Sequence, residues 1–184
     1  MTAPDPRSAF WQALKKGMAD LHFATAKGSA SKDRLKLKCA DGTAGVLQVV
    51  LLRGSSGPGG FEASNSLVLE GGRLRALLDT LGCANIKRFQ PTWTFAGSSL
   101  FLVPGRLYNY RFCEGDDAAQ LAGQIVADAE RIYVPIVDGF SGDWASALDF
   151  VIREPRPIPR PYATALVLAA LAGQPGRLDE FVAA

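Results

Sequence analysis

The glycine-rich segment RGSSGPGGF, residues 53–61, is the first place where residue types and spacing could do chemistry. A phosphate-binding loop needs G-x-x-x-x-G-K-[ST] at the start of a helix, so that backbone N–H groups, a lysine and a metal-binding hydroxyl converge on the phosphate. Gly54 and Gly59 have this separation, but Gly60 and Phe61 stand where the lysine and the hydroxyl belong. The residues after Phe61 alternate as in a strand. We therefore interpret the segment as a hairpin loop.

Nucleophilic catalysis would need a serine or cysteine beside a base. The chain has one histidine, His22, and no G-x-S-x-G nucleophile elbow. A single histidine with scattered carboxylates is also a poor match to a zinc site. Three cysteines, Cys39, Cys83 and Cys113, lie far apart and form no C-x-x-C pair. This pattern favours buried thiols in a reducing cytoplasm over disulfides or a zinc site, and we expect no catalytic residue, no metal and no cofactor.

Paired carboxylates are a third kind of candidate, because glycoside hydrolysis uses two carboxyl groups about 5 to 9.5 Å apart across a cleft. Three pairs could serve: Asp116 with Asp117, Asp128 with Glu130, and Asp138 with Asp143. The same acids could instead cap helices or lie on solvated helix faces, since several stand at predicted helix starts. A carboxylate-dependent hydrolase therefore stays an alternative.

A nucleic-acid-binding sheet is a second alternative. Basic side chains share one side of a predicted strand, and aromatic side chains alternate along another: Arg34, Lys36 and Lys38, then Tyr108, Tyr110 and Phe112. Basic residues beside exposed aromatics are how sheet surfaces bind single strands. The aromatics could equally belong to the core, and the net charge is only +2.

The charges are distributed unevenly along the chain. Residues 1–113 carry 15 Lys/Arg against 7 Asp/Glu, whereas residues 114–184 carry 5 against 11. Acidic patches accelerate association with basic partners. We therefore expect a protein partner with a basic surface, bound by the acids of the 114–149 stretch: Glu114, Asp116, Asp117, Asp128, Glu130, Asp138, Asp143 and Asp149.

The first half of the chain predicts a helix followed by strands. Asp5 followed by a proline is a helix start, and apolar residues at helical spacing predict a helix over 6–21. Period-two alternation over 34–39, a run rich in β-branched residues over 46–52 and alternation over 61–69 predict three antiparallel strands. Apolar side chains at every second position after Phe61 form one face of the last strand, and Asn65 falls on that face.

The second half is predicted to be mainly helical. A helix over 72–81 and two further strands within 92–113 are followed by a helix that begins at Asp117 and should end at Pro135. Ser141 can cap the next helix. The proline-rich segment 153–161 is expected to be an extended connector, and the remaining residues form a helical hairpin.

Length and composition predict one domain. The 184 residues are 48% hydrophobic and 21% charged, which is ordinary for a globular protein. Neither a secretion signal nor a membrane span is predicted, so we expect a cytoplasmic protein. We predict an α+β domain over 1–184, with a helix and about five mostly antiparallel strands in 1–113 and a helical region in 114–184.

Several segments together resemble a bacterial domain family of unknown function found in small cytoplasmic proteins. They are the N-terminal F-x-x-x-L helix, the strands VLQVVLL and FEASNSLVL, and the tail DDAAQLAGQIVADAERIYVPIVDGF with SGDWASAL. Relatives of that family are suspected to be immunity partners of secreted toxins. The resemblance implies a non-enzymatic immunity protein that binds a cognate toxin, and it assigns no site residue.

Overall fold

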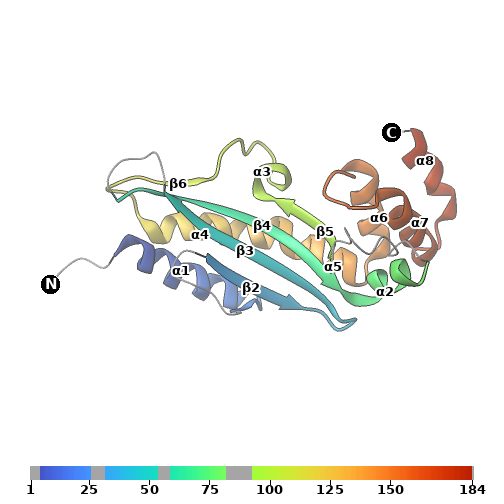
Figure 1. The fold of residues 1–184 in the computed structure, drawn as a ribbon, viewed down its shortest axis with the longest axis horizontal. Coiled ribbons are helices and arrows are strands. Elements are labelled where there is room, and N and C mark those ends of the chain that lie inside the picture. Colours follow the sequence, from blue (N-terminus) through green and yellow to red (C-terminus); the bar gives the residue numbers. More distant parts are fainter. Residues whose placement is uncertain (1–4, 26–31, 54–58, 82–92, 184) are drawn as a thin grey trace. The chain divides into compact units, whose positions relative to one another are not determined.

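A mostly antiparallel sheet of six strands is combined with helices, so the fold is α+β as predicted. The computed structural model describes residues 5–25, 32–53, 59–81 and 93–183. The strand order is β1-β2-β3-β4-β5, and β6 pairs with the start of β4. The strands are β1 (Ala24–Thr25), β2 (Lys32–Lys38), β3 (Thr43–Arg53), β4 (Phe61–Gly71), β5 (Trp93–Ser98) and β6 (Tyr110–Phe112). The helices are α1 (Pro6–Asp20), α2 (Gly72–Thr80), α3 (Ser99–Leu102), α4 (Ala118–Asp128), the π-helix η1 (Ala129–Tyr133), α5 (Val134–Ser141), α6 (Trp144–Arg153), α7 (Pro161–Leu171), the 3-10 helix η2 (Pro175–Arg177) and α8 (Leu178–Ala183) (Figure 1).

The chain folds into two compact units, each assembled from segments that are distant in sequence. Unit 1 comprises Met1–Leu37, Val46–Leu67 and Gly97–Val134, and unit 2 comprises Lys38–Gly45, Val68–Ala96 and Pro135–Ala184. The helix α4, from the predicted helical region 114–184, belongs to the same unit as α1.

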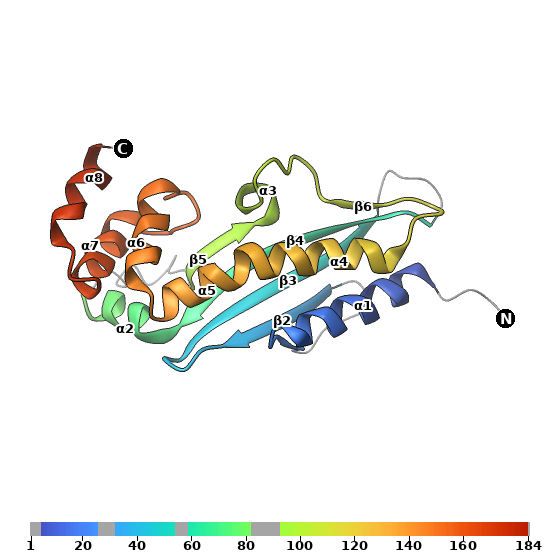
Figure 2. The ribbon, with the colours of Figure 1, turned by 180° about the vertical axis from the view of Figure 1, so that it is seen from behind.

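In unit 1 the helices α1 and α4 lie side by side against the strands (Figures 1 and 2). Asp5 caps α1 as expected, because its carboxylate accepts the Ser8 N–H at 3.2 Å. Aromatic rings fill the core between helix and sheet: Phe61 of β4 lies 5.6 Å from the Phe10 ring and is stacked at 4.7 Å on Phe112. The predicted apolar face of β4 is confirmed, and Asn65 is buried within it.

In unit 2 one carboxylate joins the β2–β3 turn to the start of α2. Asp41 accepts the Thr43 N–H at 2.8 Å and the Arg73 N–H at 3.2 Å, and so satisfies a donor at the first turn of α2. Gly72 beside it has a φ of +79°, and a Cβ there would lie 2.0 Å from the Thr43 hydroxyl. Only glycine therefore fits at this position.

The core of unit 2 is built around three phenylalanines. The Phe95 ring lies 5.8 Å from Phe140 and 5.6 Å from Phe150. The helix α7 packs against α6 and α2 and contributes buried side chains such as Leu168. The helix α7, the turn at η2 and the helix α8 form the helical hairpin that the sequence predicts.

Two predicted helix boundaries in this region were wrong. Pro135 does not end a helix, because the π-helix η1 precedes it: Val134 N–H donates to Ala129 O, five residues back. Pro135 thereby becomes the second residue of α5, directly after the π-helical turn. Ser141 is the last residue of α5, and the cap of α6 is Asp143, whose carboxylate accepts the Ser146 N–H at 3.2 Å.

The proline-rich segment 153–161 differs from the expected extended connector. Ile158 N–H donates to Pro155 O at 3.0 Å and closes a turn, which buries Pro157 and Ile158. The Pro157 carbonyl accepts the N–H of Ala96 in β5 at 2.9 Å. Burial of Ile158 favours the turn over an extended chain. The glycine-rich segment interpreted as a hairpin loop, and Cys83, lie mainly or wholly outside the described residues. No helix in the described ranges has the length and hydrophobicity to span a bilayer.

Candidate binding site at the π-helical turn

The buried carboxylate of Asp128, the last residue of α4, is the centre of a polar network in unit 1. Its Oδ2 accepts hydrogen bonds from Arg106 Nη2 at 2.9 Å and from the Tyr110 hydroxyl at 2.6 Å. Its Oδ1 accepts a hydrogen bond from Arg131 Nη2 at 3.0 Å. A buried carboxylate is tolerated only when it is paired and hydrogen-bonded, and here three donors meet that requirement.

The π-helix η1 supplies two members of this network. Arg131 approaches Asp128 from one side, and the Tyr133 hydroxyl donates to Asn65 Oδ1 at 3.2 Å on β4. The Asn65 side chain thus has a partner for its oxygen in the middle of an apolar strand face. π-helical turns are rare and occur frequently at functional sites. Asp128 just before this turn and Tyr133 within it are both buried, so the turn places polar groups in the core.

The pKa values of both buried tyrosines are raised above the usual value for a tyrosine. Burial raises the pKa of Tyr110, and its hydrogen bond to Asp128 raises the pKa further. Burial and then the charge of Asp128 raise the pKa of Tyr133. Removing either proton would place a second negative charge beside the carboxylate in a poorly hydrated region. Tyr110 therefore remains a donor to Asp128 at pH values where an exposed tyrosine would ionise.

A pocket of about 410 Å³ opens beside this network. It is lined by residues 103–109, Asp128 and Arg131. The Arg106 guanidinium carbon lies 3.7 Å from the centroid of the Tyr110 ring, so cation–π stacking fixes the guanidinium plane. Two arginines and one aspartate leave a single surplus positive charge. The arrangement is suited to binding an anion and offers no paired acid and base.

Two large apolar side chains stand at the same pocket. Leu107 is 78% exposed and Tyr108 is 74% exposed, and both contribute to the lining. Phe101, 66% exposed, belongs to the same segment between β5 and β6. Adjacent exposed apolar side chains on an anchored segment are typical of a protein contact surface.

The eight predicted acidic residues serve different purposes. In unit 1, Asp116 accepts the Cys113 N–H at 2.6 Å, and Asp117 caps α4 by accepting the Ala119 N–H at 2.8 Å. Asp128 is buried and lines the pocket described above. Glu114 and Glu130 are exposed.

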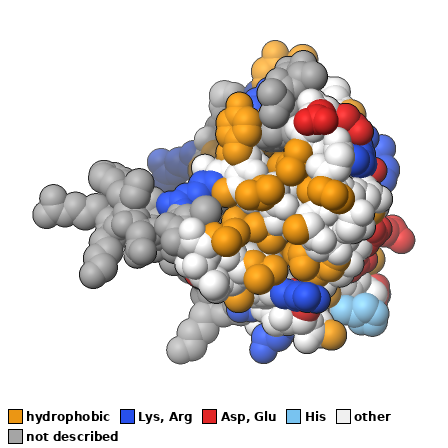
Figure 3. Space-filling view, turned by 90° about the vertical axis from the view of Figure 1, so that its right-hand side faces the viewer, with side chains coloured by type: hydrophobic (Ala, Val, Ile, Leu, Met, Phe, Trp, Pro, Cys, Tyr) orange, Lys and Arg blue, Asp and Glu red, His pale blue; other side chains and the backbone are white. Residues whose placement is uncertain are grey.

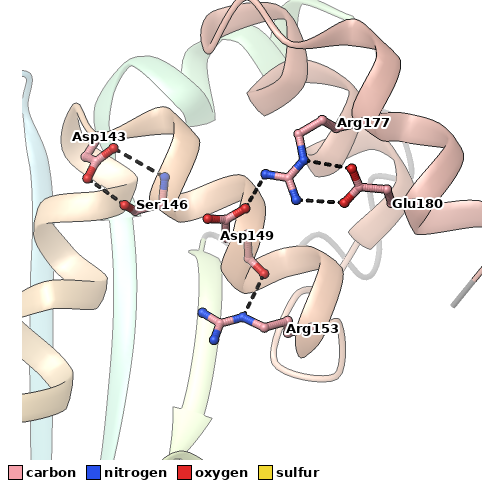
Figure 4. Close-up of polar contacts among 6 residues, drawn as sticks. All are labelled: Asp143, Ser146, Asp149, Arg153, Arg177 and Glu180. Carbon is pink, nitrogen blue, oxygen red and sulfur yellow. Dashed lines mark hydrogen bonds and ion pairs between the residues drawn. The ribbon is translucent and has the colours of Figure 1, made fainter.

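The remaining three acids belong to unit 2. Asp143 caps α6, and hydrogen bonds from Ser146 lower the pKa of its carboxyl. Asp149 on α6 pairs with Arg177 of η2, which also pairs with Glu180 of α8 at 2.7 Å (Figure 4). Asp138 is exposed. Most of these acids therefore have structural partners, and a role in partner binding stays a prediction for all eight.

The two alternatives from the sequence, a nucleic-acid-binding sheet and a carboxylate-dependent hydrolase, depend on residues that are partly buried or lie outside the pocket of unit 1. Tyr110 and Phe112 belong to the core and cannot stack on bases, whereas Arg34 and Lys36 are half-buried on β2. Asp128 is the one predicted acid in the pocket of unit 1. A second pocket, of about 160 Å³ in unit 2, contains Phe150 and Arg153 in its lining and no acid. No group of three or more possible metal ligands occurs within the described ranges.

Unit 2 also has an exposed apolar face, on α7. This helix carries no charged residue, and both Tyr162 and Leu166 are exposed, by 71% and 52%. Figure 3 looks onto this part of the chain and shows hydrophobic side chains gathered there, with charged side chains mainly around them. A helix that is apolar on all sides is normally covered on all sides.

Arg106, Tyr133 and Leu107 are the residues of this site that sequence reasoning missed. One signal was available: Asn65 on an apolar strand face needs a polar partner, and Tyr133 is a candidate within the following helices. Comparison of the chain with protein-family models, with curated proteins and with solved structures finds no match.

Proposed function

We propose that this protein is a non-enzymatic binding module for another protein and that the pocket rim of unit 1 is its main contact surface. The observation that carries the proposal is the pair Leu107 and Tyr108, adjacent and more than 70% exposed at a pocket lined by two arginines. Tyrosine and arginine are enriched among the residues that dominate binding energies at protein interfaces.

The segment that presents these side chains is fixed in place. Arg106 immediately precedes Leu107 and is held by the Asp128 carboxylate and the Tyr110 ring. A segment that is already held in one conformation loses little conformational entropy on binding. More of the contact energy then contributes to affinity. A surface with these properties favours recognition of a folded partner.

Within this class we propose an immunity protein that neutralises a cognate bacterial toxin. This narrower proposal is supported by the resemblance noted in the sequence and by the exposed acids Glu114, Glu130 and Asp138. Exposed acids attract a cationic partner over a distance of about a Debye length and raise its association rate. Desolvated contacts such as Tyr108 would then hold it.

A co-expression pull-down with the products of neighbouring genes tests the proposal. The partner is expected to be retained by the unmodified chain and to bind about tenfold more weakly or worse to the Tyr108→Ala variant. Tyr162→Ala is the matched control, because Tyr162 is similarly exposed, at 71% against 74%, but lies on unit 2. If no neighbouring product binds or is neutralised, the proposal loses its support. If Tyr162→Ala weakens binding while Tyr108→Ala does not, the contact surface is assigned wrongly.

A further inference from the structure

The residues that line the pocket beside Asp128 carry more positive than negative charge. Arg106 and Arg131 each use Nη2 to contact one oxygen of the same carboxylate. A guanidinium carries five N–H donors, so each arginine retains donors beyond this contact. Arg106 Nε is buried and has no hydrogen-bond partner among the described residues. The site therefore holds one unbalanced positive charge together with unused donors.

The Asp128 carboxylate holds both guanidinium groups in position. Arg106 is further restrained by the Tyr110 ring, and its side chain is 21% exposed. Arg131 is 67% exposed and faces solvent on the other side of the carboxylate. A new ligand would find two planar groups already oriented, which lowers the entropic cost of binding.

We propose that this pocket is an oxyanion site that binds a carboxylate, through the N–H groups of Arg131 and Arg106 that Asp128 does not occupy. Planar guanidinium groups match the two oxygens of a carboxylate. A carboxylate carries one negative charge and balances the single surplus positive charge, whereas a phosphate monoester carries about 1.5 to 2 negative charges near neutral pH. For the source of the carboxylate, the inference rests on the proposed function: an acidic side chain or chain terminus of the bound protein, inserted between Leu107 and Tyr108.

Titration with sodium acetate against sodium chloride at constant ionic strength tests the site without a partner. Acetate is expected to shift the ¹⁵N signals of the arginine Nε–H groups of Arg131 and Arg106 in a saturable way. Arg131→Gln is expected to weaken acetate binding at least about tenfold, since it removes a charge-assisted donor set. Arg131→Lys should recover only part of the affinity, because a lysine keeps the charge but lacks the planar fork.

Arg111→Gln is the matched control. Arg111 is an exposed arginine of the same unit that pairs with Glu62 at 3.3 Å and does not line the pocket. Its acetate affinity should equal that of the unmodified chain. The inference is overturned if acetate gives no saturable shift, if the two glutamine variants behave alike, or if inorganic phosphate binds more than about tenfold more tightly than acetate.

The partner assay separates this inference from the proposed function. Saturating acetate and Arg131→Gln should both weaken partner binding. If acetate binds but leaves partner binding unchanged, the carboxylate does not come from the partner, and the contact surface excludes the pocket. If no partner is found although acetate binds, the proposed function fails and the oxyanion site stands.

Discussion

Tyr110 donates a 2.6 Å hydrogen bond from its hydroxyl to Oδ2 of Asp128, and both side chains are buried in unit 1. The bond connects β6 to the end of α4 directly in front of the π-helical turn. It also positions the ring on which the Arg106 guanidinium stacks. One tyrosine therefore organises both the carboxylate and the arginine of the candidate site.

Removing this hydroxyl should destabilise the fold. Tyr110→Phe keeps the ring under Arg106 but leaves a buried carboxylate with one donor fewer, which costs about 1 to 3 kcal/mol in the free energy of unfolding. Urea denaturation measures the difference. Tyr108→Phe, at an exposed position, should change the free energy by less than about 0.5 kcal/mol. Equal effects of the two variants would contradict the network.

Alkaline pH should lower the free energy of unfolding through the two buried tyrosines, Tyr110 and Tyr133. The pKa values of Tyr110 and Tyr133 are raised above the usual value of 10.0, so the folded chain keeps two protons that the unfolded chain releases. Their contribution to stability is complete below about pH 10 and declines as the pH rises further. Unfolding free energies measured from about pH 9 upward should fall, and less steeply for Tyr133→Phe than for the unmodified chain. Parallel slopes would show that Tyr133 titrates normally.

The contact between α1 and α4 makes Gly17 sensitive to a single methyl group. A Cβ at Gly17 would lie 2.6 Å from Cγ2 of Val126. Gly17→Ala should therefore lower the unfolding free energy by about 1 kcal/mol or more, despite the better helix propensity of alanine. In the Val126→Ala background the same substitution should instead raise it, by up to about 1 kcal/mol. A double-mutant cycle measures this reversal, and additive effects would refute the close approach.

The exposed face of α7 should tolerate truncation and the buried face should not. Leu168→Ala removes a fully buried side chain and should cost about 2 to 5 kcal/mol. Leu166→Ala, two residues away and 52% exposed, should cost less than about 0.5 kcal/mol. Thermal or urea unfolding of the two variants provides the comparison. A large loss for Leu166→Ala would mean that this face is covered.

The sequence alone determined those elements whose signals are local. Asp5 and Asp117 stand directly before apolar residues at helical spacing, and both accept backbone N–H groups at helix starts. The period-two pattern after Phe61 decided which face of β4 is buried, including Asn65. These features depend on neighbours a few residues away, so the chain's own order contains the information.

The tertiary structure decided everything that depends on a distant partner. Asp128 belongs to an acidic stretch in sequence, yet Arg106 and Tyr110 turn it into a buried ion-pair centre. Pro135 continues a helix because a π-turn precedes it, and π-turns have no sequence signal that we could use. From its neighbours alone, a charged residue predicts exposure and a proline predicts a helix end. Burial and pairing across about 20 residues of chain override both predictions. The pocket, its surplus positive charge and its exposed rim therefore emerge only when β6 and the segment before it pack against the end of α4.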